Sequence, residues 1–523
     1  PLNATLARQY DATTTAAGST LSSFDALQGG ETLTMTGSGT AASKNVANGI
    51  AMASNGTLAL ANGTGAASNY SLNSTVINIS KRVLNSSGSK TYDANTNALA
   101  SAITLSNLAS TETLNKSGTA STSSANAGSY TISNLTGVSI ADGTNGGLAS
   151  NYTLTGGTHS FTVNRRVVGV SGTRLYDATT NAVASDLATH ANLVGSQTLT
   201  LSGTGTIASK NVGSNKTVSI GTLALGNGSN GGLAANYTLT GGTHQLTVNQ
   251  RPLNATLARQ YDATTTSAGS TLSSFDALQG GETLTMTGSG TAASKNVANG
   301  IAMSSNGNLA LVDGTGLASN YSLNSTVINI AQRVLNSSGS KTYDGNTNAV
   351  ASDVTLSNLA GGQTLSHSGT ATLGSKNVGS STISNLSGIS IADGTGAASN
   401  YTLTGGTHNF TVNQRVVNVS GTRLYNALNT AVASDLSTMT NLVGSETLVL
   451  SNSGTLANAN VGSSKTVTIG SLGLANGSNG GLAANYTLTG GTHQLTVNAA
   501  PISFTGTRQY NATTDVEAAN ITL

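Results

Sequence analysis

The segment Thr173-Arg174-Leu175-Tyr176-Asp177-Ala178-Thr179-Thr180 sets the architecture of the chain because it recurs. A basic residue, any residue, a tyrosine and an aspartate or asparagine return at intervals of 82–85 residues. This first landmark has its tyrosines at Tyr10, Tyr92, Tyr176, Tyr261, Tyr343, Tyr425 and Tyr510, and its aspartates at Asp11, Asp93, Asp177, Asp262 and Asp344. Repetition at a fixed period is typical of an array of similar structural units.

Two further landmarks follow each of the first six tyrosines in a constant order. The second is Asn-Val or Asn-Ala, with its asparagine at Asn45, Asn126, Asn211, Asn296, Asn377 and Asn460. The third is Asn-Tyr-[Ser/Thr]-Leu, with its tyrosine at Tyr70, Tyr152, Tyr237, Tyr321, Tyr401 and Tyr486. We therefore predict six β repeats at 1–81, 82–165, 166–250, 251–332, 333–414 and 415–499, and the start of a seventh at 500–523.

The sequence also repeats with a second, longer period. Residues 252–332 repeat residues 1–81 with eight differences, so the fourth repeat is a near copy of the first. Neighbouring repeats differ far more from one another. Because identical neighbours can exchange elements while they fold, this separation of near-identical copies is expected to reduce misassembly.

The composition excludes several classes of protein. Only 8% of the 523 residues are charged, against about 25% in ordinary globular proteins. No basic run suggests nucleic-acid binding, and no apolar run approaches the roughly 20 residues of a membrane helix. The absence of cysteine excludes disulfides and suits export through an oxidising compartment. Because the chain begins at Pro1, we expect a fragment or a processed form.

Within a repeat the hydrophobic pattern has a period of two. Polar and apolar residues alternate in 31–36, 245–249 and 466–469, which is typical of half-buried strands. Turn pairs such as Asn48-Gly49 and Asp142-Gly143 separate these segments. We predict an all-β fold: a tandem array of about six small β-sandwich-like domains. The period is too long for the rungs of a continuous β-solenoid, which recur at roughly 20–30 residues.

The linkers between repeats are short. In 163–168 and 412–417 the last strand of one repeat passes to the first strand of the next without a Gly/Ser tract or a proline-rich spacer. Such junctions restrict the motion of consecutive domains, so we expect an elongated rod.

The Tyr-Asp pair is interpreted as a folding element. The tyrosine ring is expected to anchor the core of its unit, and the aspartate to form an Asx turn with a nearby backbone N–H. Two roles remain open for Arg174: covering the ring of Tyr176, or pairing with Asp177. A calcium site is the alternative, but acids are few and scattered, and the asparagines Asn426 and Asn511 remove the charge.

Other candidate chemistry is weak. The histidines in Gly-Gly-Thr-His frames fall on separate repeats and are expected at surface turns: His159, His244, His408 and His493. No Gly-x-Ser-x-Gly elbow lies in an α/β context, and no glycine-rich segment ends as a phosphate loop does. We therefore predict no catalytic residues, no metal and no cofactor. Glycan binding by each repeat also lacks support. Carbohydrate sites usually expose aromatic side chains, and only two or three tyrosines per repeat are available.

The three landmarks together resemble a known family. Segments 341–347 (KTYDGNT), 375–379 (SKNVG) and 398–403 (ASNYTL) resemble the YDG-type repeat domain of large bacterial surface and secreted proteins of the filamentous-haemagglutinin-like adhesin type. The resemblance covers all the complete repeats. It implies an extracellular stalk or fibre of tandem β-domains with no enzymatic role. Glycine follows Tyr-Asp only at Gly345, a departure that affects the turn geometry.

These observations lead to one functional expectation and one alternative. We expect a non-catalytic structural stalk or fibre region of a giant bacterial surface or secreted adhesin, extracellular or at the cell surface. Any host ligand is expected to bind outside this segment, and we expect neither nucleic acid nor membrane insertion. The alternative is a self-assembling extracellular filament or biofilm-matrix fibre in which repeats contact other copies of the chain through strand donation or edge pairing.

Overall fold

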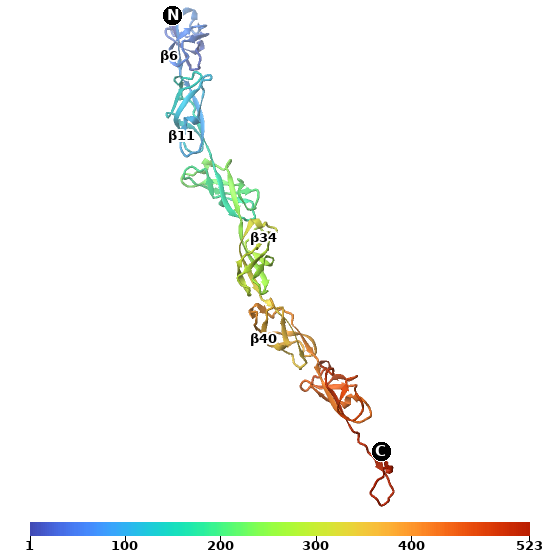
Figure 1. Cartoon of the computed structure of the whole chain (residues 1–523). Helices are drawn as coiled ribbons and strands as arrows, with labels where there is room; N and C mark the ends of the chain where they lie inside the picture. The colour runs from blue at the N-terminus through green and yellow to red at the C-terminus, as the bar shows by residue number, and fades with distance from the viewer. The chain divides into compact units, whose positions relative to one another are not determined.

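The computed structural model describes the backbone of residues 1–523 and the side chains of residues 1–132 and 135–523. It divides into two units, the first formed by Pro1–Arg251, Gln279–Gly281 and Ser319–Tyr321 and the second by the remaining residues. Each repeat is a small domain of short strands, with single turns of 3-10 helix (Figure 1). The prediction of an all-β tandem array is confirmed, and the residues described contain no α-helix.

The first repeat shows the basic arrangement. Its strands form one curled six-stranded sheet and a two-stranded ribbon. The sheet has the order β2 (Thr15–Ala17), β5 (Ser38–Ala41), β6 (Ala47–Ser54), β8 (Leu72–Ser80), β1 (Leu2–Gln9), β3 (Leu21–Phe24), and the ribbon pairs β4 (Leu33–Thr36) with β7 (Ala59–Asn62). In β1 the burial alternates along the strand, as the period of two predicts.

The first and last long strands of each repeat are neighbours in the middle of its sheet. In the first repeat, β1 and β8 run parallel along their full length. The parallel arrangement recurs for β10 (Asn85–Thr91) with β17 (Ser160–Asn164), β19 (Gly169–Leu175) with β27 (His244–Asn249), β37 (Asn336–Thr342) with β44 (Asn409–Asn413), and β46 (Asn418–Leu424) with β54 (His493–Asn498). In the fourth repeat, β28 (Arg251–Gln260) and β35 (Tyr321–Ala331) are neighbours in the same sheet positions.

The second and fifth repeats vary this plan. There the two strands that are separate in the first repeat form one long strand, which pairs with both the sheet and the ribbon. These long strands are β13 (Leu114–Thr122), which contacts β11 (Asn97–Leu99), β14 (Gly128–Asn134) and β15 (Val138–Asp142), and β40 (Leu365–Leu373), which contacts β38 (Asn348–Val350), β41 (Gly379–Asn385) and β42 (Ile389–Asp393).

The third, fourth and sixth repeats keep the separate ribbon of the first. Their remaining sheet strands are β20 (Asn181–Val183), β21 (Thr189–Ala191), β23 (Thr204–Ile207) and β24 (Gly213–Ser219); β29 (Thr266–Ala268), β30 (Leu272–Phe275), β32 (Ser289–Ala292) and β33 (Ala298–Ser305); and β47 (Thr430–Val432), β48 (Thr438–Thr440), β50 (Ser453–Leu456) and β51 (Gly462–Thr468). The ribbons are β22 (Leu199–Ser202) with β25 (Ala224–Asn227), β31 (Leu284–Thr287) with β34 (Ala310–Asp313), and β49 (Leu448–Ser451) with β52 (Gly473–Asn476).

Small aliphatic and aromatic side chains fill the cores. In the second repeat, Phe161 on β17 is 1% exposed and packs with Ile103 and Val163. Gly88 on β10 leaves room for this ring, because a Cβ there would lie 2.8 Å from Phe161 Cδ2. The tyrosines Tyr92 and Tyr237 belong to the same buried cluster although they come from consecutive repeats. The cores therefore continue across this boundary inside the first unit.

Candidate functional site: the junction between adjacent repeats

The first landmark forms a closed turn. Asp177 Oδ1 accepts a hydrogen bond from the backbone N–H of Thr179 at 3.0 Å, as expected for an Asx turn. Arg174 forms an ion pair with Asp177 and donates to the Thr179 carbonyl at 2.7 Å. Of the two roles that the sequence left open for Arg174, the structure shows the pairing with Asp177.

The residue after Tyr-Asp has a left-handed backbone conformation. Ala178 has a φ of 64° and Gly345, its equivalent in the fifth repeat, a φ of 79°. Glycine adopts this region without steric penalty, which explains why a glycine can stand in the motif. A Cβ on Gly345 would lie 2.7 Å from Val443 Cγ1 of the sixth repeat, so this turn also touches the next repeat.

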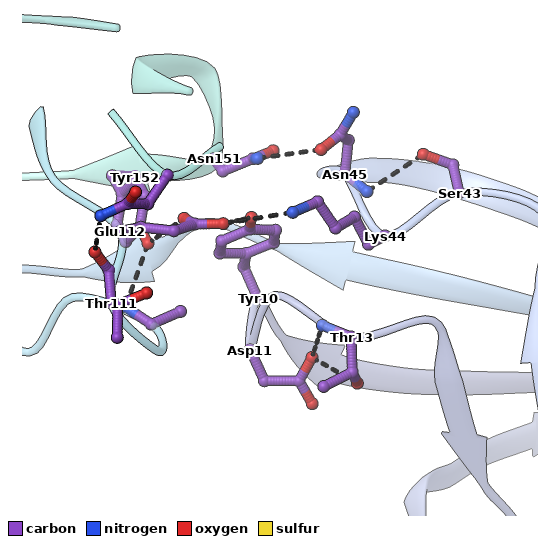
Figure 2. A network of polar contacts seen from close by, with 12 residues as sticks. Tyr10, Asp11, Thr13, Ser43, Lys44, Asn45, Thr111, Glu112, Asn151 and Tyr152 are labelled. Atoms are coloured by element: carbon purple, nitrogen blue, oxygen red, sulfur yellow. Dashed lines mark hydrogen bonds and ion pairs between the residues drawn. The ribbon is translucent and has the colours of Figure 1, made fainter. Parts of the chain in front are cut away.

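The tyrosine of the first landmark lies at the boundary with the following repeat. The rings of Tyr10 and Tyr152 meet edge to face, with centroids 5.4 Å apart. Glu112 lies between them and accepts a hydrogen bond from each hydroxyl, from Tyr10 to Oε1 at 2.6 Å and from Tyr152 to Oε2 at 2.6 Å (Figure 2). The predicted core anchor is therefore buried, but its hydroxyl reaches the second repeat.

The buried carboxylate has a cation beside it. Glu112 is 4% exposed, and Lys44 Nζ lies 3.3 Å from its Oε1. Burial raises the pKa of Glu112, but hydrogen bonds from Tyr10, Tyr152 and Lys44 together hold that pKa below its ordinary value. Burial and the hydrogen bond to Glu112 raise the pKa of Tyr152 to about 12. The junction thus favours an ionised glutamate between two neutral phenols.

The second and third landmarks bind each other across the same boundary. Asn151 is fully buried; its Oδ1 accepts from the Val46 N–H at 2.9 Å, and its Nδ2 donates to Asn45 Oδ1 at 3.0 Å (Figure 2). The same amide pair recurs as Asn126 with Asn236, Asn211 with Asn320, Asn296 with Asn400, and Asn377 with Asn485. All three landmarks therefore converge on one junction.

The tyrosine pairs recur at the same spacing. Ring centroids lie 5.3–5.4 Å apart in Tyr92–Tyr237 and Tyr176–Tyr321 of the first unit and in Tyr261–Tyr401 and Tyr343–Tyr486 of the second. Edge-to-face pairs of this kind add about 0.5–1.5 kcal/mol each to the energy of the buried area.

The residue between the two hydroxyls is either glutamate or glutamine. Glu446 accepts from Tyr343 at 2.7 Å and from Tyr486 at 2.6 Å, as Glu112 does. Gln197 instead donates through Nε2 to the Tyr92 hydroxyl at 3.0 Å and accepts from Tyr237 at 2.5 Å. Gln363 makes the same pair of contacts with Tyr261 and Tyr401. The amide reverses one of the two hydrogen bonds without changing the packing of the rings.

Three landmark tyrosines depart from this arrangement. Tyr70 is half-buried and donates to Glu31 of its own repeat at 2.7 Å. Tyr425 is 42% exposed and Tyr510 91% exposed, so the expectation of a core anchor is wrong for these two. The physical reason is that the following repeat supplies the burial of this ring, and residues 500–523 form no packed repeat that could bury Tyr425 or Tyr510.

An arginine clamp at the start of the repeat was not anticipated from the sequence. Arg82 donates to the Asn107 carbonyl at 2.6 Å and to the Tyr10 carbonyl at 3.2 Å, while Asn107 Nδ2 donates to the Val83 carbonyl. The pair recurs as Arg166 with Asn192, Arg333 with Asn358, and Arg415 with Asn441. The signal for Glu112 was also present, because Glu or Gln before Thr-Leu recurs once per repeat.

The recurrent histidines are structural partners within their repeats. The expected surface position is wrong for His244 and His493, which are 5% and 4% exposed. Their Nε2 atoms lie 2.8 and 2.7 Å from the carbonyl oxygens of Leu239 and Leu488. This hydrogen bond satisfies one ring nitrogen of each histidine, so that nitrogen can be buried. Among the residues described, no group of three or more acids and histidines could hold a metal ion, and no helix could span a membrane.

Comparison with known proteins assigns the family. The model of the YDG domain matches six successive segments, residues 2–77, 80–160, 163–245, 244–328, 331–409 and 411–494. A small all-β repeat joined to its neighbours through tyrosine junctions is thus a YDG domain, and the chain belongs to the YDG-domain family. Among curated proteins no match is found.

One of the solved structures that match aligns over most of this chain but has a low structural similarity. It is the crystal structure of the N-terminal eight Ig domains of Down Syndrome Cell Adhesion Molecule (DSCAM) isoform 1.30.30, with 8% identity, a TM-score of 0.10, and 96% of this chain and 86% of that chain covered. At this TM-score the similarity carries no argument about fold or function.

Proposed function

We propose that this chain is a non-catalytic, load-bearing stalk segment of a large bacterial surface or secreted adhesin. The observation that supports this role is the parallel pairing of the first and last long strands within a repeat. In the first repeat the ladder runs from Leu2 opposite Leu72 to Gln9 opposite Ser80. Because parallel strands point the same way, the chain enters a repeat at one end of the sheet and leaves at the other.

This topology suits tension along the chain. A pull on the two ends of a repeat moves β1 and β8 in opposite directions along their shared ladder. The backbone hydrogen bonds of the ladder are then loaded together in shear, whereas a pull across a hairpin opens them one at a time. Resistance to forced unfolding depends on the unfolding rate, which such a ladder keeps low.

The junctions suit the same role. A buried ring pair, an amide pair and the Glu112 or Gln197 type of contact join consecutive repeats inside each unit. Each of these contacts restrains rotation about the short linker. The polar groups of the junction form hydrogen bonds with one another, which favours a mechanical over a chemical role.

The remaining parts of the proposal follow from the family resemblance. The stalk is placed outside the cell or at its surface, without cofactor, nucleic acid or membrane insertion. Adhesive ligands are assigned to other parts of a longer protein.

Light scattering combined with small-angle X-ray scattering of the full chain tests the proposal. A stalk gives a monomer at all concentrations, with a maximum dimension several times that of a compact protein of the same mass. A compact monomer contradicts it. Concentration-dependent fibres contradict it as well, and instead favour the self-assembling filament.

A further inference from the structure

Every junction joins two distinct surfaces. The trailing face of one repeat carries the first-landmark tyrosine, the second-landmark asparagine and the residue just before that asparagine. The leading face of the next repeat carries Glu or Gln, the third-landmark asparagine and its tyrosine. Each face has one variable position at which the charge differs: Lys or Ala on the trailing face, and Glu or Gln on the leading face.

The variable positions combine in a restricted way. Lys44 forms an ion pair with Glu112, whereas Lys376, at the equivalent sequence position in the repeat before Glu446, is exposed and forms no ion pair with that glutamate. Ala125 stands on the trailing face that meets Gln197. A lysine, Lys295, stands on the face that meets Gln363, so lysine occurs with either partner. In these four junctions both glutamates follow a repeat with lysine, and the one alanine precedes a glutamine.

The chemistry of the junction accounts for this restriction. Glu112 and Glu446 are at most 9% exposed, and a carboxylate at such a position is strongly destabilised unless a cation and donors compensate it. Lys44 Nζ supplies the cation at 3.3 Å. Glutamine has the same shape and no charge, so it is compatible with either trailing residue.

We propose that this position sets the docking specificity of the repeats. A trailing face with lysine accepts a leading face with glutamate or glutamine, whereas a trailing face with alanine accepts only glutamine. Leading faces with Glu112 or Glu446 are therefore excluded from the trailing face of Ala125, whether they belong to the same chain or to a second copy. The trailing face of the sixth repeat carries Ala459, so its partner is a YDG repeat whose leading residue is glutamine.

This inference rests on the junction geometry and stands whether or not the chain is a stalk. It is tested by hydrogen exchange of the full chain, measured on one amide at the second junction and one amide inside the third repeat. The Ala127 N–H donates to Asn236 Oδ1 at 2.8 Å, and the Val194 N–H donates to the Tyr237 hydroxyl at 3.1 Å. The Ala127 bond joins the two repeats and breaks when this junction opens, whereas the Val194 bond lies within the third repeat and reports the folding of that repeat.

Three variants separate charge matching from general damage. Gln197→Glu places a carboxylate opposite Ala125 and is expected to accelerate exchange of the Ala127 amide about tenfold, while the Val194 amide shows whether the third repeat stays folded. The double variant Ala125→Lys with Gln197→Glu is expected to restore the original rates. Gln363→Glu is the matched control: Lys295 already stands opposite, so the Val297 amide, which donates to Asn400 Oδ1 at 2.8 Å, keeps its protection.

Two results overturn the inference. One is unchanged exchange in Gln197→Glu. The other is a loss of protection in that variant that Ala125→Lys fails to restore, because the damage is then not one of charge. If Gln197→Glu unfolds the third repeat altogether, the double variant still distinguishes a charge mismatch from general damage. Recovery of the β19–β27 ladder indicates a charge mismatch, and continued unfolding indicates general damage.

Discussion

At the scale of single residues, Glu112 and Gln197 show how little separates two versions of one contact. Both side chains lie between two tyrosine hydroxyls from consecutive repeats. The carboxylate accepts twice, while the amide donates once and accepts once. Only the carboxylate gives its junction a group that titrates in acid, so the two kinds of junction are expected to differ in their response to low pH.

Glutamate junctions are expected to weaken in acid. Because the pKa of Glu112 in the folded chain lies below its ordinary value of 4.5, its stabilisation is complete above pH 4.5 and is lost as the pH falls through the lower folded value. Protection factors for the Val46 amide, measured between pH 3 and pH 6 (roughly the window of this titration), should fall at the acid end. In Glu112→Gln this fall should disappear, and its persistence there would show that Glu112 is not the cause.

The same junctions are expected to weaken in alkali. Burial and the bond to Glu446 raise the pKa of Tyr343 and Tyr486 from 10.0 to about 12. Stabilisation by the neutral phenols is therefore complete below pH 10.0 and is lost as the pH rises towards 12. Tyrosinate absorbance during an alkaline titration checks this: several tyrosines, among them Tyr152, Tyr343 and Tyr486, should ionise late in the wild type, and Tyr343→Phe should remove one of them.

Gly345 offers a test of the turn after Tyr-Asp. Gly345→Ala forces a Cβ into a left-handed backbone and to within 2.7 Å of Val443, so we expect a loss of about 1–2 kcal/mol in the stability of this turn. The matched control is Ala94→Gly, which relieves the same backbone conformation at φ 64° and should be neutral or stabilising. Hydrogen exchange of the two turns in the full chain measures both effects, and equal effects of the two changes would contradict this explanation.

At the scale of elements, the strands could be predicted and their partners could not. Alternation in 245–249 marks β27 because side chains on successive residues of a strand point to opposite faces. Nothing in that alternation says that β27 pairs in parallel with β19, some 70 residues earlier, because pairing depends on which loops bring the strands together. The three landmarks were visible as a period, yet their convergence is a contact between consecutive repeats, which a pattern within one repeat does not encode.

The local roles of residues in the candidate site could be predicted from the sequence, whereas their contacts with the next repeat could not. Tyr10 was recognised as a large buried ring and Asp11 as the cap of a turn, because both roles are local. The role of Glu112 could not be predicted from a recurrent charge, because Gln197 and Gln363 stand where other repeats have glutamate. What recurs at this position is the shape that glutamate and glutamine share, and a pattern of recurrent acids does not reveal it.

Phe161 tests the packing of β17 against β10. Truncation by Phe161→Ala removes a ring that is 1% exposed, and we expect a loss of about 3–5 kcal/mol in the stability of the second repeat. Leu99→Ala is the control, because this side chain on the edge strand β11 is 55% exposed and should change stability by less than about 0.5 kcal/mol. Exchange protection of the β10–β17 ladder reports both, and a small effect of Phe161→Ala would show that the core is not centred on this ring.

At the scale of the whole molecule, the chain is a succession of YDG domains that share their sheet order and the tyrosine and asparagine pairs of their junctions. The near copies at 1–81 and 252–332 share their sheet order, while the repeats between them alternate in charge at the junction and in the continuity of the long strand. Distinct neighbours reduce the number of alternative dockings during folding. The central claim is that each repeat resists tension as one parallel ladder.

Stretching single full-length chains between their ends tests that claim most directly. The account predicts six abrupt unfolding events, one per complete YDG domain, each releasing roughly 250 Å of chain after the folded length is subtracted. Gradual lengthening at low force, or steps much shorter than one repeat, would show that strands peel away singly, and would contradict the assignment of the paired first and last strands as the load-bearing element.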